Sequence, residues 1–131
     1  MLEANDDGSF LLTGDQRKLT LAELSDTEKY PFHGVDLVTL SACETAAGES
    51  GGNEIEGLAL RLDERGNGAR TVLATLWAIQ PDDSFPLIES FDEWLQKGLP
   101  KAEALRRAEV SRIQQQPPGS WAPFILIGDW R

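Results

Sequence analysis

Hydrophobic residues of this 131-residue chain gather in short runs, separated by stretches in which they recur three or four positions apart. Runs over residues 35–40, 71–79 and 121–128 are nearly continuous in apolar and β-branched side chains, a pattern typical of strands buried on both faces. A shorter run over residues 9–13 predicts one further strand near the beginning of the chain. The periodic stretches between the runs predict amphipathic helices.

Two capping patterns mark helix starts in the first half of the chain. Thr20 is placed to cap a brief helix over residues 22–24. Asn53 and Glu56 have the spacing of a capping box, so a longer helix is predicted to begin after Asn53. One face of that helix would carry Ile55, Leu58, Ala59 and Leu62.

Two further helices are predicted between the second and third apolar runs. Asp82 or Asp83 is positioned to cap the first, and Pro100 opens the second. Lys101, with the arginines that follow it, is expected to stay in solvent. The side chains expected to face inward are Phe85, Ile88, Phe91 and Leu95 in the first helix, and Ala102, Leu105 and Ala108 in the second.

The order of these elements predicts an α/β fold. Buried strands alternating with helices indicate a mainly parallel sheet that is covered on both faces. Three core strands make a thin sheet, so we expect residues 1–131 to form a single domain that is incomplete at its N-terminal side. Residues 1–8 are polar and are expected to be disordered.

The net charge of the chain limits the classes of molecule that it can bind. Acidic residues number 22 against 12 basic ones, giving a net charge of −10. This field repels phosphate backbones, so we expect no nucleic acid partner. A basic peptide or protein face would suit it, although the charge also serves solubility alone. The acidic N-terminus is unlike a signal peptide and no apolar run reaches about 20 residues. We therefore expect a cytoplasmic protein without membrane contact.

The chain's only cysteine, Cys43, follows the central apolar run over residues 35–40. One cysteine forms no internal disulfide, and no cysteine and histidine cluster suits zinc, so we expect neither metal nor cofactor. A lone cysteine is commonly a small buried hydrophobe. A thiol at the carboxyl end of a strand and before a helix, however, lies where α/β sheets bind ligands, and nearby backbone N–H groups favour the thiolate.

A thiolate nucleophile needs a base, and the chain offers one histidine, His33. His33 precedes the central strand and Cys43 follows it. Residues 35–41 at about 3.3 Å each separate the two ends by roughly 20 Å, so the two side chains are expected at opposite edges of the sheet. His33 is better interpreted as a surface residue in a connector than as the base.

Residues 36–48, DLVTLSACETAAG, resemble the signature of CHAT domains, which are caspase-like domains of bacteria often attached to tetratricopeptide repeats. The resemblance runs from about Ser9 to the end of the chain. It continues through EGLA at 56–59, GAR at 68–70, ATLW at 74–77, KAEALRRA at 101–108 and WAPFILIGDW at 121–130.

The resemblance implies a caspase-like three-layer α/β/α sandwich and a cysteine peptidase with a His–Cys dyad. Cys43 matches the nucleophile of the family. The family's histidine lies in a His-Gly-type motif after the preceding core strand, and no residue of this chain matches it. Either the sequence is a partial domain or the histidine arrives from elsewhere, and the isolated chain is expected to be inactive on peptides.

Five further residues are candidates for the substrate cleft. Ala42 is small enough to leave room for a substrate backbone, and Glu44 beside the thiol has an open role. Trp77 could wall the cleft or be a core tryptophan. Asp82 and Asp83 could attract a basic side chain or cap a helix.

Three functions are compatible with these residues. The first is the catalytic-cysteine half of a CHAT-type endopeptidase that acts on protein or peptide substrates. The second is a non-catalytic caspase-like module for signalling or protein interaction. The third is another thiol enzyme on an α/β sheet, such as an acyl transferase, which would need a base that this sequence does not offer.

Overall fold

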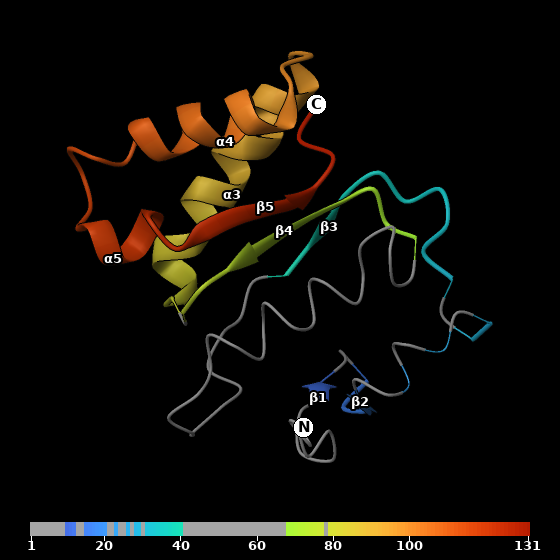
Figure 1. The fold of residues 1–131 in the computed structure, drawn as a ribbon. Coiled ribbons are helices and arrows are strands. Elements are labelled where there is room, and N and C mark those ends of the chain that lie inside the picture. Colours follow the sequence, from blue (N-terminus) through green and yellow to red (C-terminus); the bar gives the residue numbers. More distant parts are fainter. Residues whose placement is uncertain are drawn as a thin grey trace, which may run out of the picture.

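The computed structural model describes most of the chain after residue 67 and shorter parts before it (Figure 1). The described residues are 10–12, 15–20, 23, 26, 28–29, 31–40, 68–77 and 79–131. The helix predicted after Asn53 lies outside them, as do residues 1–8.

Near the N-terminus, strands β1 (Phe10–Leu12) and β2 (Lys18–Thr20) form an antiparallel pair in which Phe10 lies opposite Thr20. The strand predicted over residues 9–13 is thus confirmed, whereas its partner β2 was not expected. Thr20 makes the hydrogen bonds expected of a capping residue, whereas the helix predicted over residues 22–24 lies, apart from Glu23, outside the described residues. The Thr20 Oγ1 accepts from the Glu23 N–H at 3.2 Å, and the Glu23 carboxylate accepts from the Thr20 N–H at 3.0 Å, which is a capping box.

A three-stranded sheet forms the centre of the structure (Figure 1). Its strands are β3 (Val38–Thr39), β4 (Thr71–Thr75) and β5 (Phe124–Gly128), with β4 in the middle. Every residue of β4 is buried, as its continuous apolar sequence predicts. Hydrogen bonds from the Arg70 N–H to the Val35 carbonyl and from the Leu40 N–H to the Leu73 carbonyl extend the β3–β4 contact beyond β3 itself.

The sheet is mixed rather than mainly parallel. β3 and β4 are parallel, but β4 and β5 are antiparallel, with Thr75 opposite Phe124. The reason is the connection between β4 and β5, which contains two long helices. The first helix leads away from the carboxyl end of β4 and the second leads back to it. β5 therefore starts at that edge and runs in the opposite direction.

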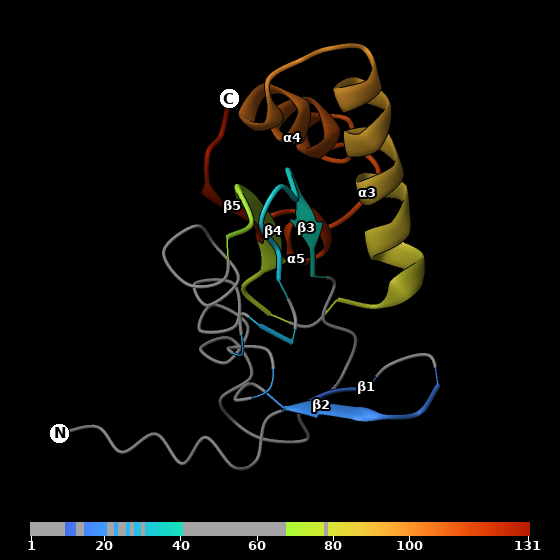
Figure 2. The ribbon, with the colours of Figure 1, turned by 90° about the vertical axis from the view of Figure 1, so that its right-hand side faces the viewer.

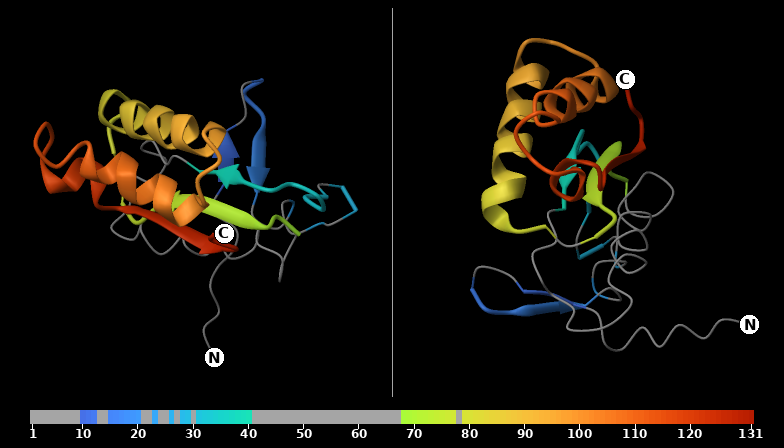
Figure 3. Two further views of the ribbon diagram at one scale, coloured as in Figure 1. Left: turned by 90° about the horizontal axis from the view of Figure 1, so that it is seen from above. Right: turned by 90° about the vertical axis from the view of Figure 1, so that its left-hand side faces the viewer.

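Helices α3 (Pro81–Gln96) and α4 (Lys101–Val110) cover one face of the sheet (Figure 2, Figure 3). The short helix α5 (Pro118–Trp121) follows them and leads into β5. Trp94 of α3 contacts α4 through Arg107, whose guanidinium group lies 4.8 Å from the centre of the Trp94 ring. Lys97, at the end of α3, lies 4.2 Å from the same ring centre, and both distances are within cation–π range. No helix in the described parts has the length and apolar character needed to cross a bilayer.

The buried side of α3 is rotated from the predicted one. Ser84, Leu87 and Phe91 are buried, whereas Phe85 is 59% exposed and the prediction for it is wrong. Apolar residues lie on more than one side of this helix, so periodicity alone allowed either rotation. The contacts with β4 and α4 determine which side is buried.

Lys101 is buried in the first turn of α4, and its expected exposure is wrong. Its ammonium group lies 3.2 Å from both carboxylate oxygens of Asp36 and donates to the main-chain oxygen of Arg131 at 3.1 Å. Ala104 is buried in place of Ala102, whose N–H donates to the Trp130 carbonyl. Asp36 and the Arg131 oxygen together satisfy the buried ammonium group of Lys101, as a buried lysine requires.

Two apolar clusters lie on opposite faces of β4, because successive strand residues point to opposite sides. Val72 and Ala74 pack with Ala69 on one face, with Phe32 and Ile125 at the margin. Leu73 lies on the other face beneath the helices. There it belongs to a cluster with Ile79, Leu87, Phe91, Ala104, Leu105, Ala108 and Phe124.

Partial burial in α4 raises the pKa of Glu109 to about 7, from an ordinary value of 4.5. Between these pH values the unfolded chain is ionised at Glu109 while the folded protein keeps the proton. The free energy of unfolding therefore falls as pH rises from about 4.5 to 7. We expect Glu109→Gln to flatten this decline, as measured by urea unfolding at a series of pH values.

Glu103→Gln is the matched control for Glu109, because the hydrogen bonds of Arg106 and Arg107 lower the pKa of Glu103 to about 2. Ionised Glu103 therefore stabilises the folded protein, and this contribution to the free energy of unfolding is lost as pH falls from about 4.5 to 2, a lower range and an opposite direction to those of Glu109. An unchanged slope above pH 4.5 in Glu109→Gln would contradict the prediction.

Candidate functional site

The carboxyl ends of β3 and β4 define one edge of the sheet. The two strands are parallel, and the Leu40 N–H still donates to the Leu73 carbonyl at 2.8 Å as the chain leaves β3. β4 reaches the same edge at Thr75. In open α/β sheets this is the edge at which ligands bind, so the predicted site must be sought here.

Three of the predicted site residues, Ala42, Cys43 and Glu44, lie outside the described residues. Their roles stay predictions. The described residue nearest to them in sequence is Leu40, which is hydrogen bonded to β4 at this edge.

Trp77 lies two residues after the end of β4 and is 43% exposed. Its indole Nε1 donates to the Gly119 carbonyl of α5 at 2.9 Å. The interpretation of Trp77 as a core tryptophan is therefore wrong, and its role as a wall of a cleft stays a prediction. This hydrogen bond ties the indole ring to α5 and so restricts its orientation. The exposed part of the ring is therefore an apolar surface of fixed orientation at this edge of the sheet.

Asp82 and Asp83 lie in the first turn of α3, and neither caps it. Gln80 occupies the N-cap position without a side-chain cap, and Pro81 takes the first helical position, where its missing N–H removes no helical hydrogen bond. The two carboxylates instead interact favourably with the positive, N-terminal end of the helix dipole. Asp83 also accepts from the Gln116 amide at 3.4 Å, while Asp82 is exposed.

One polar group at this edge was missed from the sequence. Thr75, the last residue of β4, is 2% exposed, and its hydroxyl finds no hydrogen-bond partner among the described residues. A threonine at the end of a run of β-branched residues is typical of a strand, so the sequence pattern gave no indication of a functional role for Thr75. A buried hydroxyl without a partner is destabilising.

Replacing Thr75 with valine is expected to raise the free energy of unfolding by about 1 kcal/mol, since the change removes an unsatisfied polar group and keeps the branched shape. Urea unfolding of the full chain measures the change. Thr71→Val provides the comparison, because the Thr71 hydroxyl donates to the Asp129 carbonyl and its removal should lower stability. A loss of stability in Thr75→Val would show that this hydroxyl is bonded.

His33 lies at the other edge of the sheet. Its exposed imidazole ring lies against Gly68, which has a positive φ of 96° and precedes β4. A β-carbon at Gly68 would collide with that ring. The prediction that His33 belongs to the amino-terminal ends of the central strands is confirmed.

The described residues contain no group of three or more His, Cys, Asp or Glu side chains that could hold a metal ion. The described groups at the carboxyl-terminal edge of the sheet are the indole of Trp77, the buried hydroxyl of Thr75 and the carboxylates of Asp82 and Asp83.

Comparison with protein families matches residues 1–129 of the chain to the family described as CHAT domain. No curated protein matches the sequence. No solved structure matches it either.

Proposed function

The chain belongs to the CHAT domain family, a family of caspase-like peptidases, and we propose that it contributes the nucleophile of a cysteine endopeptidase. In this proposal a histidine base takes the proton from the Cys43 thiol. The thiolate attacks a peptide carbonyl carbon, the amine leaves with a proton from the histidine, and water hydrolyses the acyl-enzyme.

The observation that carries the proposal is the family match over residues 1–129, which includes the Ser-Ala-Cys-Glu-Thr sequence after β3. The parallel pairing of β3 with β4 supports it, because the chain leaves β3 at a ligand-binding edge. Cys43 follows Leu40 by three residues, and three residues of chain span at most about 11 Å. That reach is compatible with the proposed position of the Cys43 thiol at this edge.

We extend the proposal to the fold: a single caspase-like domain with three α/β/α layers, of which this sequence supplies a part. Two observations support this. Helices α3 and α4 cover one face of the sheet, and an apolar cluster containing Val72 lies on the other. In the described residues β3 pairs on one side only, which is compatible with a further strand on its second side.

The base has to come from a residue other than His33. The chain has a single histidine, and His33 lies beside Gly68 at the amino-terminal ends of the strands. We therefore propose that a histidine beyond this sequence completes the dyad, and that the chain by itself does not turn over peptides.

The remaining assignments follow the edge of the sheet. The backbone N–H of Cys43 would donate to the oxyanion, with Ala42 leaving room for the substrate backbone. Trp77 would contact the substrate with its exposed ring, and Asp82 and Asp83 would favour a basic side chain. Glu44 stays unassigned because a carboxylate opposes thiolate formation unless it points away.

The setting proposed for this activity is the bacterial cytoplasm, with a protein or peptide as substrate and tetratricopeptide repeats upstream. Neither nucleic acid nor a membrane is part of the proposal.

The test is the rate of alkylation of Cys43 by iodoacetamide as a function of pH. Because the chain has one cysteine, all labelling reports on that thiol. We expect a thiol pKa at least one unit below the usual value of about 8.5 in the folded chain. The same chain in concentrated urea is the matched control and should return the usual value.

An ordinary or unreactive Cys43 thiol that persists in the full-length protein, in which the proposed histidine would be present, would contradict the proposal and favour the non-catalytic interaction module. Sustained hydrolysis of peptides by the isolated chain that is lost in Cys43→Ala would refute the need for an external base.

A further inference from the structure

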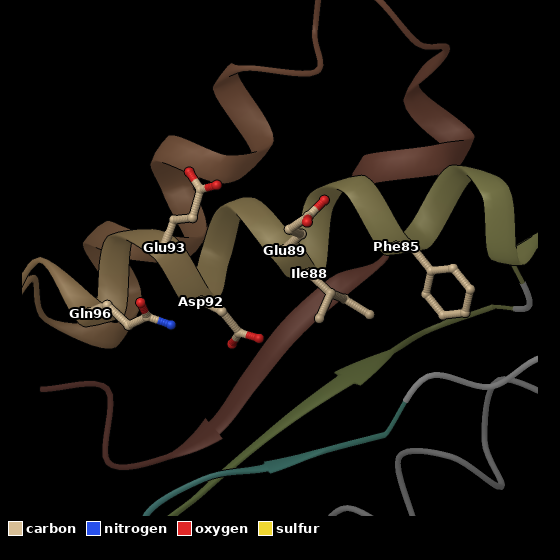
Figure 4. Close-up of a pocket in the computed structure, with 6 residues that line it drawn as sticks. All are labelled: Phe85, Ile88, Glu89, Asp92, Glu93 and Gln96. Carbon is tan, nitrogen blue, oxygen red and sulfur yellow. The ribbon is translucent and has the colours of Figure 1, made fainter.

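One side of α3 carries a shallow, open surface formed by six residues of that helix (Figure 4). These residues, called here the α3 outer face, are Phe85, Ile88, Glu89, Asp92, Glu93 and Gln96. They recur three or four positions apart over about three turns, so they form one continuous surface. In Figure 4, Phe85, Ile88 and Asp92 project from the lower side of the helix, and Glu93 projects from the upper side.

The carboxylates of this face have no ion-pair partner among the described residues. Glu89, Asp92 and Glu93 are three and four positions apart, at which like charges repel each other. No lysine or arginine occurs anywhere in Pro81–Gln96. Lys97, just beyond the helix, lies over the Trp94 ring.

Helix α4 shows the opposite arrangement. Its Glu103 binds Arg106 at 2.7 Å and Arg107 at 2.9 Å, so the carboxylate is neutralised within its own helix. The two helices are neighbours and belong to the same layer, yet among the described residues no cation pairs with the carboxylates on this side of α3. The charge on α3 is thus available to a cation from another molecule.

The same face exposes apolar surface. Phe85 is 59% exposed, one of the largest such fractions among the large hydrophobic side chains of the described residues. Ile88, one turn further along, is half-buried, because it packs partly against the core cluster beneath the helix, and its remaining surface belongs to the same face. A phenylalanine that adds little to the core and lies beside carboxylates suits an anchor for a partner.

We propose that the α3 outer face binds a basic segment of another protein, with a large apolar side chain of the partner against Phe85 and Ile88 and flanking lysines or arginines on Glu89, Asp92 and Glu93. Charge complementarity selects this occupant. The net charge of −10 disfavours a second copy of this acidic chain and disfavours nucleic acid. The proposal stands whether or not Cys43 is catalytic.

The experiment measures fluorescence anisotropy of a labelled synthetic peptide that alternates pairs of lysines with leucines, titrated with the full chain. We expect saturable binding that weakens as salt is added, since the carboxylates are exposed. Peptides with serine in place of leucine, or glutamate in place of lysine, should not bind.

Variants locate the binding. The triple variant E89Q/D92N/E93Q is expected to lose about tenfold in affinity, the combined effect of three exposed ion pairs. The matched control E3Q/D6N/D7N removes the same charge elsewhere in the sequence and should change affinity less than about twofold. Phe85→Ala, which leaves the core intact, should weaken binding about fivefold or more.

Three outcomes would overturn the proposal. They are absence of binding by the unmodified chain, an equal loss in the triple variant and its control, and equal binding of the serine peptide. The second would mean that only the overall field attracts the peptide. The third would mean that Phe85 and Ile88 take no part.

Discussion

Replacing Phe91 with alanine is expected to lower the free energy of unfolding by about 3–5 kcal/mol, the range for large buried side chains. Phe91 is fully buried and packs in the cluster that joins α3 and α4 to β4. Its removal leaves a cavity between elements held by their own packing, so the surroundings cannot close over it easily.

Phe85→Ala is the matched control for Phe91, because it makes the same change on the same helix at a 59% exposed position. It should change stability by less than about 0.5 kcal/mol. Urea unfolding followed by circular dichroism measures both variants. Equal losses in the two would contradict the orientation of α3 described here.

A second large effect is expected at Gly128, the last residue of β5. Its φ of +101° is one that other residues rarely adopt, and a β-carbon there would press into the Arg70 carbonyl oxygen. That oxygen also accepts the Asp129 N–H at 2.8 Å, so neither partner is free to move. Gly128→Ala should therefore lower the free energy of unfolding by about 3 kcal/mol or more.

Gly98→Ala separates backbone strain from collision. Gly98 has a φ of +84° after the end of α3, but nothing lies within 4 Å of a β-carbon built there. Its loss should be about 1 kcal/mol, the strain alone. Thermal unfolding ranks the two variants, and a Gly98 loss equal to that of Gly128 would rule out the proposed contact with Arg70.

Local sequence patterns predicted the long helices and every strand of the described residues except β2, but the direction of β5 was predicted wrongly. Continuous apolar runs identify buried strands regardless of direction. Strand direction depends on where the intervening connection ends, and here α3 and α4 lead away from and back to the carboxyl end of β4, which only the folded chain shows.

Lys101 shows what a periodic pattern omits. Its charge and its position on the same helix as Arg106 and Arg107 suggested a solvent-exposed side chain, yet its partners Asp36 and Arg131 are 65 and 30 residues away. Only the folded chain brings them together. A lysine is rarely buried without such partners, and no local signal identifies them.

The candidate site divides along similar lines. Trp77 and the two aspartates lie at the sheet edge to which their positions after β4 assigned them. The bond from Trp77 to Gly119 depends on α5, which returns to the edge after two helices. The role of Cys43 rests on its sequence context and on the family to which the chain belongs.

The contacts of Lys101 also bear on how the protein is best produced. Its ammonium group and the first turn of α4 are held by main-chain oxygens of Trp130 and Arg131, not by their side chains. A purification tag fused after Arg131 preserves both oxygens, whereas trimming the last two residues would leave a buried cation with Asp36 as its sole acceptor among the partners described above.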